Sequence, residues 1–419
     1  MKKVSVIILI LLFSFIGCSN IKNQENTIDK EKSEILNSID NSFEIIDYEE
    51  FDYKNSKKEI FDYIYENNDK ENTFFSPTSL NLALELVFNG TEVGSNEEKI
   101  LTNYLPKNHE KRYVNFTNKA LDSEGLKVAN SIWIDDRYKF NEKYLEKVME
   151  YNPKCGSINT EEPQKSTDYI NNWVNDSTEG CIPSIINESS IDNSVRLLLI
   201  NSLYFNSEWE NEWEDTGHYY IFTDFNGEKR NLKKIKTKYC NSYFCNENAE
   251  GFSKKYKNGY EFIGILPLKK GDFTISNIDI ESFLKSRSTE YEVTAIMTPF
   301  RIENNIMLKD ILKETELSPL FIENSVHNRG IQHIIKSPDN KDIPLWISDI
   351  IQKSYIDITS KGTKAAATTA VIMTDSLGAC EGLGKESKEK TIWLDRPFLF
   401  LILEPETEEI VFIGKVVSP

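Results

Sequence analysis

The chain has 419 residues, 39% of them hydrophobic and 11% aromatic, which is enough for a large core in one domain or in two to three ordinary domains. Its 67 acidic residues outnumber 49 basic residues, and the formal net charge of -18 excludes nucleic acid as the main partner, because phosphates would be repelled. We interpret the excess negative charge as a solubilising surface charge.

The N-terminus carries a short apolar segment. Residues 4–16 (VSVIILILLFSFI) follow two lysines and precede Cys18. This run is too short to span a bilayer but suits the core of a signal peptide. Cys18 resembles the lipidated cysteine of a bacterial lipoprotein signal, although Phe15 stands where leucine is usual. We predict a lipoprotein signal peptide over 1–17 and an extracytoplasmic protein tethered to the cell surface or envelope by lipid on Cys18. An ordinary secretory signal is the alternative.

Residues 18–55 are polar and acidic and contain no glycine or proline after Cys18, so we interpret them as a solvated tether. The remaining cysteines are an odd number without paired spacing, which is not typical of a disulfide framework. They are Cys155, Cys181, Cys240, Cys245 and Cys380. A local bridge between Cys240 and Cys245 stays open.

The apolar patterns after residue 55 predict helices mainly early in the chain and strands mainly late, an α+β ordering within one domain over 56–419. Helices are expected at 57–68, from a cap at Thr78 or Ser79 to Gly90, from Ser95 onward, and at 141–152, 166–180 and 308–317. Strands are expected at 72–76, 127–134, 196–205, 260–268 and 292–304, at 342–360 after a helical turn, and twice within 396–419 around a turn at 404–409.

Motifs of common enzymes are missing from the sequence. There is no glycine-rich phosphate loop, no His-Glu-x-x-His helix and no Gly-x-Ser-x-Gly elbow. The four histidines lie in polar stretches, and none forms a ligand-spaced cluster with cysteines. They are His109, His218, His327 and His333. We therefore expect no enzyme activity, no cofactor and no metal.

Five stretches, in order along the chain, resemble motifs of the serpin family. They are NTFFSPTSLNLALELVFNG (72–90), INNWVNDSTEGCIPSII (170–186), RLLLINSLYFNSEWENEW (196–213), ISDIIQKSYIDITSKGTKAAATTAVIM (347–373) and RPFLFLILEPETEEIVFIGKVVSP (396–419). The resemblance implies an α+β serpin fold with a helical bundle, three β-sheets and an exposed reactive loop over about 360–392. It also implies a monomer whose partner is a target protease.

The resemblance gives GTKAAATTAVIM (362–373) a role as the hinge of that loop. A protease would cleave the loop and form an acyl-enzyme, and the hinge would then insert into the central sheet as a new strand. About fourteen inserted residues at ~3.3 Å each would carry the protease ~45 Å. A fixed core strand or an alanine-rich helix is the alternative, which the glycine-containing, charged stretch 374–391 disfavours.

Insertion requires small, uncharged side chains on the face that meets the core. The alternate residues starting at Thr363 satisfy this requirement, Lys364 would point towards solvent, and Gly362 would give the pivot backbone freedom. A charged side chain at position 363, the first of these alternate residues, would be buried without a partner. The hinge residues are Gly362, Thr363, Lys364, Ala365, Ala366, Ala367, Thr368 and Thr369.

The family's usual spacing from the hinge places the scissile bond at Ser376–Leu377. The stretch that follows is longer than usual in the family, so Ala379–Cys380 is a second candidate. No Lys or Arg lies between residues 365 and 384, and a trypsin-like protease, whose pocket needs a cation, is therefore not expected as the target. Subtilisin-like or elastase-like proteases are favoured, and papain-like cysteine proteases stay open.

The resemblance also assigns residues in the sheet. A polar cluster beneath the central strands would consist of Ser76, Ser79, Asn201 and Gln352, with Gln352 where histidine is common. The insertion point would include Trp209, Phe300 and Ser360. Phe300 and Ser360 stand where many members carry a basic and an acidic residue, so no orphan charge is left. A non-inhibitory serpin-fold binding or structural protein is the second hypothesis, and an unrelated surface hydrolase the third.

Overall fold

The computed structural model describes residues 71–123, 125–269, 278–323, 330–336, 344–363, 388–404 and 406–419. All of them belong to one unit, Asp52–Pro419. The predicted signal peptide, the tether and the helix expected at 57–68 lie outside the described residues. No helix within these described ranges is long and apolar enough to cross a membrane.

A seven-stranded sheet forms the centre of this unit. Its long strands are, in spatial order, β4 (Lys154–Ile158), β2 (Leu126–Asp135), β5 (Leu197–Phe205), β15 (Ile347–Ile358) and β13 (Phe300–Met307). The short strands β16 (Gly362–Thr363) and β6 (Ser207–Glu208) complete it. Strands β2 and β4 are parallel, and so are β5 and β15; the other neighbours are antiparallel.

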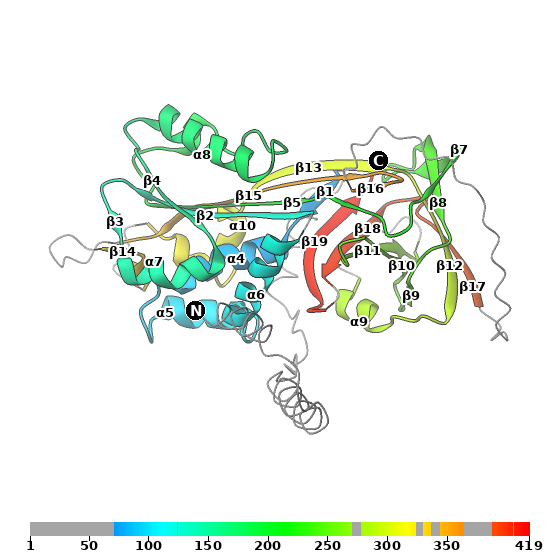
Figure 1. Ribbon diagram of the computed structural model, residues 1–419, viewed down its shortest axis with the longest axis horizontal. Helices are drawn as coiled ribbons and strands as arrows, with labels where there is room; N and C mark the ends of the chain where they lie inside the picture. The colour runs from blue at the N-terminus through cyan, green and yellow to red at the C-terminus, as the bar shows by residue number, and fades with distance from the viewer. Residues whose placement is uncertain are drawn as a thin grey trace, which may run out of the picture. The chain divides into compact units, whose positions relative to one another are not determined.

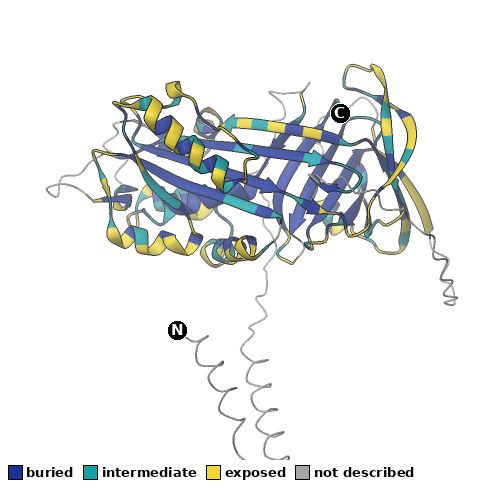
Figure 2. Ribbon diagram, turned by 45° about the horizontal axis from the view of Figure 1, so that its top comes forward, coloured by how far each residue is buried: buried dark blue, intermediate teal, exposed yellow. Residues whose placement is uncertain are grey.

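Helices cover both faces of the central sheet (Figure 1). Helix α8 (Pro163–Ser177) lies on one face, and the opposite face carries α4, α5, α6 and α7. Those four helices span Pro77–Phe88, Asn96–Tyr104, His109–Asp122 and Glu142–Val148. Every residue of β5 is buried, as its continuous apolar run predicts (Figure 2).

Two further sheets lie beyond the helices (Figure 1). The six-stranded sheet has the order β1 (Thr73–Phe75), β19 (Glu409–Val416), β18 (Phe398–Glu404), β11 (Glu261–Pro267), β10 (Ala249–Lys255), β9 (Ser242–Cys245). The four-stranded sheet has the order β17 (Lys388–Trp393), β12 (Tyr291–Met297), β8 (Lys229–Thr237), β7 (Glu214–Thr223). The short helices α9 (Ile280–Lys285) and α10 (Lys309–Lys313) and the ribbon of β3 (Lys139–Phe140) with β14 (Ile335–Lys336) complete the described α-helices and strands. Short 3₁₀ helices lie at Met149–Tyr151, Glu188–Ser190, Ser318–Phe321 and Gln332–Ile334.

The structure confirms the predicted α+β fold and corrects several local details. The cap of α4 is Ser76, which accepts a hydrogen bond from the Ser79 amide, with proline at the first helical position. The strand expected at 292–304 is two strands in different sheets, β12 and β13, separated at 298–299. Residues 344–346 are not helical, so the helical turn expected before β15 does not occur in the described part of that stretch.

Candidate functional site: the hinge and the seam of the central sheet

The seam is the junction between β5 and β15. These two strands pair directly and in parallel, from Ile347 opposite Leu197 to Tyr355 opposite Tyr204. To add a strand antiparallel to β15, the chain must first reverse its direction after β15. That reversal occurs immediately after Ile358, at residues 359–361.

The first two hinge residues already form a strand. Thr363 pairs with Ile358 of β15 on one side and with Ser207 of β6 on the other, and Gly362 pairs with Glu208. The amide of Thr359 donates to the Gly362 carbonyl at 2.8 Å and closes the turn. The structure therefore contains the start of a strand next to the end of the seam formed by Tyr204 and Tyr355.

The side chain of Thr363 points inward, as the alternation of the hinge predicts. It is fully buried, and its hydroxyl is hydrogen-bonded to the Tyr256 hydroxyl at 2.8 Å. Gly362 is required for a reason that the sequence did not reveal. A Cβ there would lie 2.4 Å from the Ser207 carbonyl oxygen, while the backbone of Gly362 has no positive φ. Close approach of β6, and not backbone freedom, therefore explains the glycine.

Two tryptophans bind the turn before the hinge. The amide of Trp209 donates to the Lys361 carbonyl at 3.0 Å, and its indole N–H donates to the Thr359 carbonyl at 2.9 Å. The amide of Trp213 donates to the Ser360 carbonyl at 2.8 Å. Three successive carbonyls are thus fixed by two residues. Trp209 in turn stacks on Tyr256, with ring centroids 4.1 Å apart.

The predicted insertion-point residues Trp209, Phe300 and Ser360 come together at this end of the sheet. Phe300 pairs with Ile358, is buried, and packs on the ring of Phe400 with centroids 5.2 Å apart. Ser360 contributes its carbonyl to Trp213. Phe300 therefore extends the aromatic core where the family commonly has a basic residue.

A lysine that the sequence did not single out lies beneath the two tryptophans. Lys254 of β10 is only 1% exposed. Its ammonium donates to the Thr237 hydroxyl and the Tyr239 carbonyl, each at 3.2 Å. It also lies 5.9 Å from the ring centroid of Trp209 and 5.7 Å from that of Trp213. The flanking KKY sequence gives no sign of this burial, because lysine is rarely buried without an anionic partner.

The predicted polar cluster lies beneath the seam and consists of two linked groups. The Ser76 amide donates to the Gln352 side-chain oxygen at 2.8 Å, and the Gln352 amide group donates back to the Ser76 carbonyl at 2.9 Å. The Ser79 hydroxyl donates to the side-chain oxygen of Asn201, whose amide group donates to Asn130 at 3.1 Å. All five residues are buried. Sequence reasoning missed Asn130, a partner supplied by the neighbouring strand β2.

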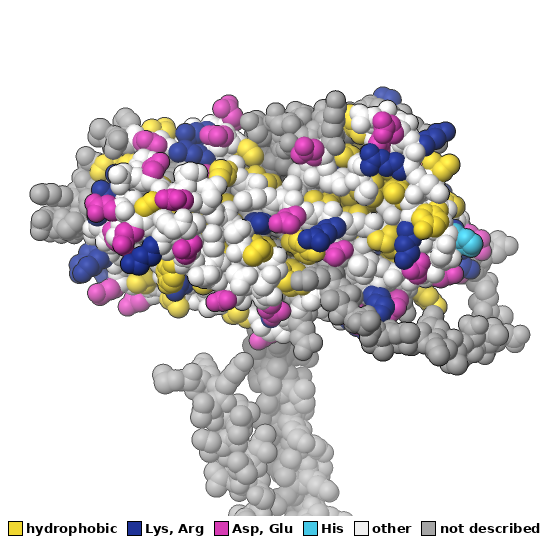
Figure 3. All heavy atoms as spheres, turned by 90° about the horizontal axis from the view of Figure 1, so that it is seen from above, with side chains coloured by type: hydrophobic (Ala, Val, Ile, Leu, Met, Phe, Trp, Pro, Cys, Tyr) yellow, Lys and Arg dark blue, Asp and Glu magenta, His cyan; other side chains and the backbone are white. Residues whose placement is uncertain are grey.

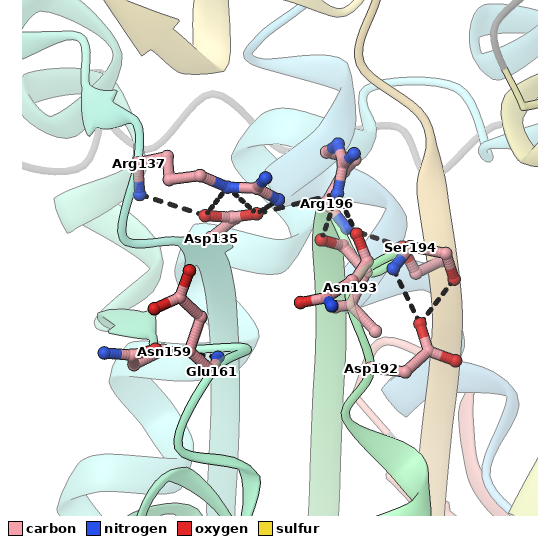
Figure 4. A network of polar contacts seen from close by, with 10 residues as sticks. Asp135, Arg137, Asn159, Glu161, Asp192, Asn193, Ser194 and Arg196 are labelled. Atoms are coloured by element: carbon pink, nitrogen blue, oxygen red, sulfur yellow. Dashed lines mark hydrogen bonds and ion pairs between the residues drawn. The ribbon is translucent and has the colours of Figure 1, made fainter.

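An ion-pair network closes the opposite end of the seam (Figure 4). The guanidinium of Arg137 donates to the fully buried Asp135 carboxylate at 2.8 Å, and that of Arg196 lies 3.6 Å from the same carboxylate. Burial would raise the pKa of Asp135, but the hydrogen bonds from Arg137 and the charge of Arg196 outweigh it and lower the pKa. The Arg196 amide also donates to the Ser348 hydroxyl at 2.8 Å. Arg196 thereby links the end of β2 to the starts of β5 and β15.

The second face of the seam, on the side of helix α8 and opposite the polar cluster, is partly covered. Near its middle, Ile351 and Leu198 pack in a core cluster with Ile170 and Val174 of α8. The amphipathic helix α8 needs an apolar surface to cover, and this stretch of the sheet supplies it. The same side of β15 is partly exposed at Lys353 and, towards the hinge, at Asp357. Charged side chains of both signs are scattered over the outer surface on this side (Figure 3).

The remaining predicted site residues lie outside the described residues. These are Cys18, the hinge residues Lys364, Ala365, Ala366, Ala367, Thr368 and Thr369, and the scissile-bond candidates Ser376, Leu377, Ala379 and Cys380. The four described cysteines, Cys155, Cys181, Cys240 and Cys245, are free thiols, so the open bridge between Cys240 and Cys245 is not formed. Within the described ranges no group of three or more His, Cys, Asp or Glu could hold a metal ion.

Comparison with known proteins places the whole described unit in one family. The family model described as serpin (serine protease inhibitor) matches residues 57–419. A serpin-like protein of Methanosarcina acetivorans is 29% identical, over 84% of this chain and 82% of its own length. The leukocyte elastase inhibitor of Xenopus laevis is 28% identical, over 86% of this chain and 97% of its own length. The crystal structure of the thermophilic serpin tengpin in its native state matches with a TM-score of 0.72 at 29% identity, over 86% of this chain and 92% of tengpin.

Proposed function

The chain belongs to the serpin family, whose members are generally protease inhibitors, and from this premise we propose that it is a suicide inhibitor of serine proteases. In this proposal the protease cleaves the loop, and the hinge side inserts into the central sheet before the acyl-enzyme can hydrolyse. The observation that carries the proposal is the start of a strand at Gly362–Thr363, beside a parallel pair of strands.

The parallel pairing of β5 and β15 favours insertion on geometric grounds. A strand that enters between them by reversing direction after β15 would run antiparallel to both neighbours. It would replace one parallel ladder with two antiparallel ladders, and antiparallel pairing is slightly more stable per residue. The energy for moving the protease would come from these new hydrogen bonds and from burial of the small hinge side chains.

The pairing of Thr363 with Ile358 defines the register of the proposed strand. Continued without a shift, it places Ala367 opposite Ser354, whose buried hydroxyl has no hydrogen-bond partner. It also places Lys364 opposite Asp357, on the partly exposed stretch of the second face. Lys364 would then meet a complementary charge, which goes beyond the expectation that it is merely harmless in solvent.

The chemical step belongs to the protease. Its serine oxygen, or a cysteine sulfur, attacks the carbonyl of Ser376 or of Ala379, the amine of the next residue leaves with a proton, and an acyl-enzyme ester or thioester remains. Water would normally hydrolyse this bond. Insertion moves the acylated protease by ~45 Å and distorts it, so the covalent complex persists.

We extend the proposal to location and target. Lipid on Cys18 would hold the inhibitor outside the cytoplasmic membrane, and residues 18–55 would act as a flexible tether. The absence of Lys and Arg between residues 365 and 384 favours subtilisin-like and elastase-like targets over trypsin-like ones. The name of the Xenopus laevis relative, leukocyte elastase inhibitor, supports the same preference.

Mixing the full chain with subtilisin, elastase, papain and trypsin tests the function directly. We expect a covalent complex that survives boiling in detergent with subtilisin or elastase, and none with trypsin. Mass spectrometry of the peptide released beyond the cut identifies the scissile bond. Clean cleavage of the loop by every protease, with no stable complex, would reject inhibition and favour a non-inhibitory serpin.

A further inference from the structure

Lys254 is the least expected charge in the described part of the molecule. It is 1% exposed, and its ammonium has two neutral acceptors, the Thr237 hydroxyl and the Tyr239 carbonyl. No described carboxylate lies within ion-pair distance of it. A buried charge with only neutral partners destabilises a fold unless its surroundings stabilise the charged form.

The surroundings of Lys254 are the faces of two indoles. Its nitrogen lies within 6 Å of the ring centroids of both Trp209 and Trp213. A cation over an indole face is attracted by the ring quadrupole, and the attraction grows when water is excluded. The same two residues bind the three carbonyls of the turn at 359–361. The ammonium is therefore one layer of contacts away from the start of the reactive loop.

Two titratable groups beside Lys254, Cys240 and Tyr256, are neutral near neutral pH. Burial raises the pKa of the Cys240 thiol to about 12 and that of Tyr256 well above its usual value, so both are neutral. Glu210, on the link after β6, is an exposed carboxylate, and Lys255 points away on the opposite side of β10. Burial lowers the pKa of Lys254 itself to about 8, against smaller opposing effects of Cys240 and Glu210.

We propose that Lys254 is a positioning residue for strand insertion: its ammonium holds Trp209 and Trp213 against the turn, and the neutral amine releases them and slows insertion. The inference rests on the proposed inhibitory function. A looser turn makes the first pairs of the inserted strand less populated, so more acyl-enzyme hydrolyses before the seam opens. The inhibitor then behaves increasingly as a substrate as the pH rises.

Two substitutions at Lys254 separate charge from shape. Lys254→Arg keeps a positive charge at every accessible pH, and Lys254→Met keeps a chain of similar length without charge. We expect the ratio of trapped to cleaved inhibitor to be high at every pH for the arginine variant. For the methionine variant we expect a ratio about tenfold lower than that of the arginine variant at every pH. The wild type should change from the first behaviour to the second around pH 8. Each comparison uses the same protease at the same pH, so the protease's own pH dependence cancels between variants.

A matched control and a second measurement complete the test. Lys255→Met removes the neighbouring lysine of the same strand and should keep the wild-type pH profile. Tryptophan fluorescence of the intact inhibitor, without protease, should shift around pH 8 in the wild type and in Lys255→Met but not in Lys254→Met. Identical pH profiles of the wild type and Lys254→Met in both measurements would overturn the proposal. If the wild type traps no protease at any pH, the proposed function fails, while the fluorescence titration still decides whether Lys254 controls the tryptophans.

Discussion

Thr363 is the first loop side chain that the core accepts, and its environment defines what the following alternate residues must resemble. It is fully buried, it bonds to Tyr256, and its backbone already pairs with strands on both sides. The space around Thr363 admits only a small side chain, and a hydroxyl placed there needs a hydrogen-bond partner such as Tyr256. Every later alternate residue would enter the same side of the sheet.

A charge at this position should convert the inhibitor into a substrate. Thr363→Lys would bury an ammonium beside Tyr256 without an anionic partner, at a cost of several kcal/mol. We expect cleavage of the loop at an unchanged rate with almost no trapped complex, measured as the ratio of the two products on a denaturing gel. Lys364→Glu is the control, because it places a charge on the second face and should retain at least part of the trapping. Normal trapping by Thr363→Lys would contradict the inward orientation during insertion.

Asp349 should make the intact protein less stable as the pH rises. It lies at a bulge near the start of β15, and burial raises the pKa of its carboxyl to about 6, although the amides of Lys309 and Ile350 donate to it. Between pH ~4 and ~6 the folded state therefore binds more protons than the unfolded state, so this contribution to stability is present at low pH and is lost as the pH rises.

Asp349→Asn removes the charge and keeps an oxygen that can accept both amide hydrogen bonds. We expect it to stabilise the intact form by ~1–3 kcal/mol at pH 7.5, and by nothing measurable at pH 4. Thermal midpoints of the two proteins at both pH values check this. An equal gain at both pH values would mean that packing, and not ionisation, separates them.

At the residue scale the sequence predicted the contacts that depend on a recognisable motif. Ser76, Ser79, Asn201 and Gln352 are brought together as the resemblance implies. Lys254 could not be predicted, because its burial results from the packing of β10 against a segment that lies far away along the chain. A lone lysine in a strand pattern ordinarily indicates an exposed position.

At the scale of elements, the seam is closed in its middle and already contains a third strand at one end. Residues Leu197–Tyr204 of β5 pair with β15. Beyond Tyr355, towards the end of β15, β16 lies between β15 and β6. The inserted strand should therefore extend the observed register, residue by residue, towards the start of β15.

Cross-linking tests this register. In a variant with Ser354→Cys and Ala367→Cys the two thiols should form a disulfide after loop cleavage, because cross-strand neighbours on one face lie ~5 Å apart. The intact form should not form this bond. The matched pair Ser354→Cys and Ala366→Cys, which places the second thiol on the opposite face, should not form it in either state. Peptide mapping by mass spectrometry identifies the bond, and the reverse pattern would indicate a register shifted by one residue.

Buried elements were easier to predict than exposed ones. The apolar runs of β5, β11 and β18 predict strands, and the structure confirms these strands and buries every residue of all three. Strands β7, β9 and β10 were not predicted, because sequences such as AEGFSKK in β10 lack an apolar alternation. Their strand structure comes from pairing with neighbours and not from local preference.

At the scale of the whole molecule, cleavage of the loop should increase heat stability strongly. In the intact form the two long strands β5 and β15 are in direct parallel contact, and the proposed mechanism inserts the hinge segment between them only after cleavage. If the hinge inserts as proposed, the completed sheet gains hydrogen bonds and buried surface without unfolding anything else, and the intact form would be kinetically trapped. We expect calorimetry to show a far higher unfolding temperature for the cleaved form. Equal temperatures would favour a serpin fold that does not insert its loop.

The Arg196 network gives the seam a direction, since it ties β2, β5 and β15 together at the end opposite the hinge. In the proposed mechanism we therefore expect the strands to separate first near Tyr204 and Tyr355 and then pair by pair towards Arg196. Trapping would then depend on whether strand separation is faster than hydrolysis of the acyl bond. Of two proteases that cut the loop equally fast, the one with the longer-lived acyl-enzyme would be trapped more often. The selectivity of the inhibitor would then depend on the deacylation rate of the protease as well as on the sequence of the reactive loop.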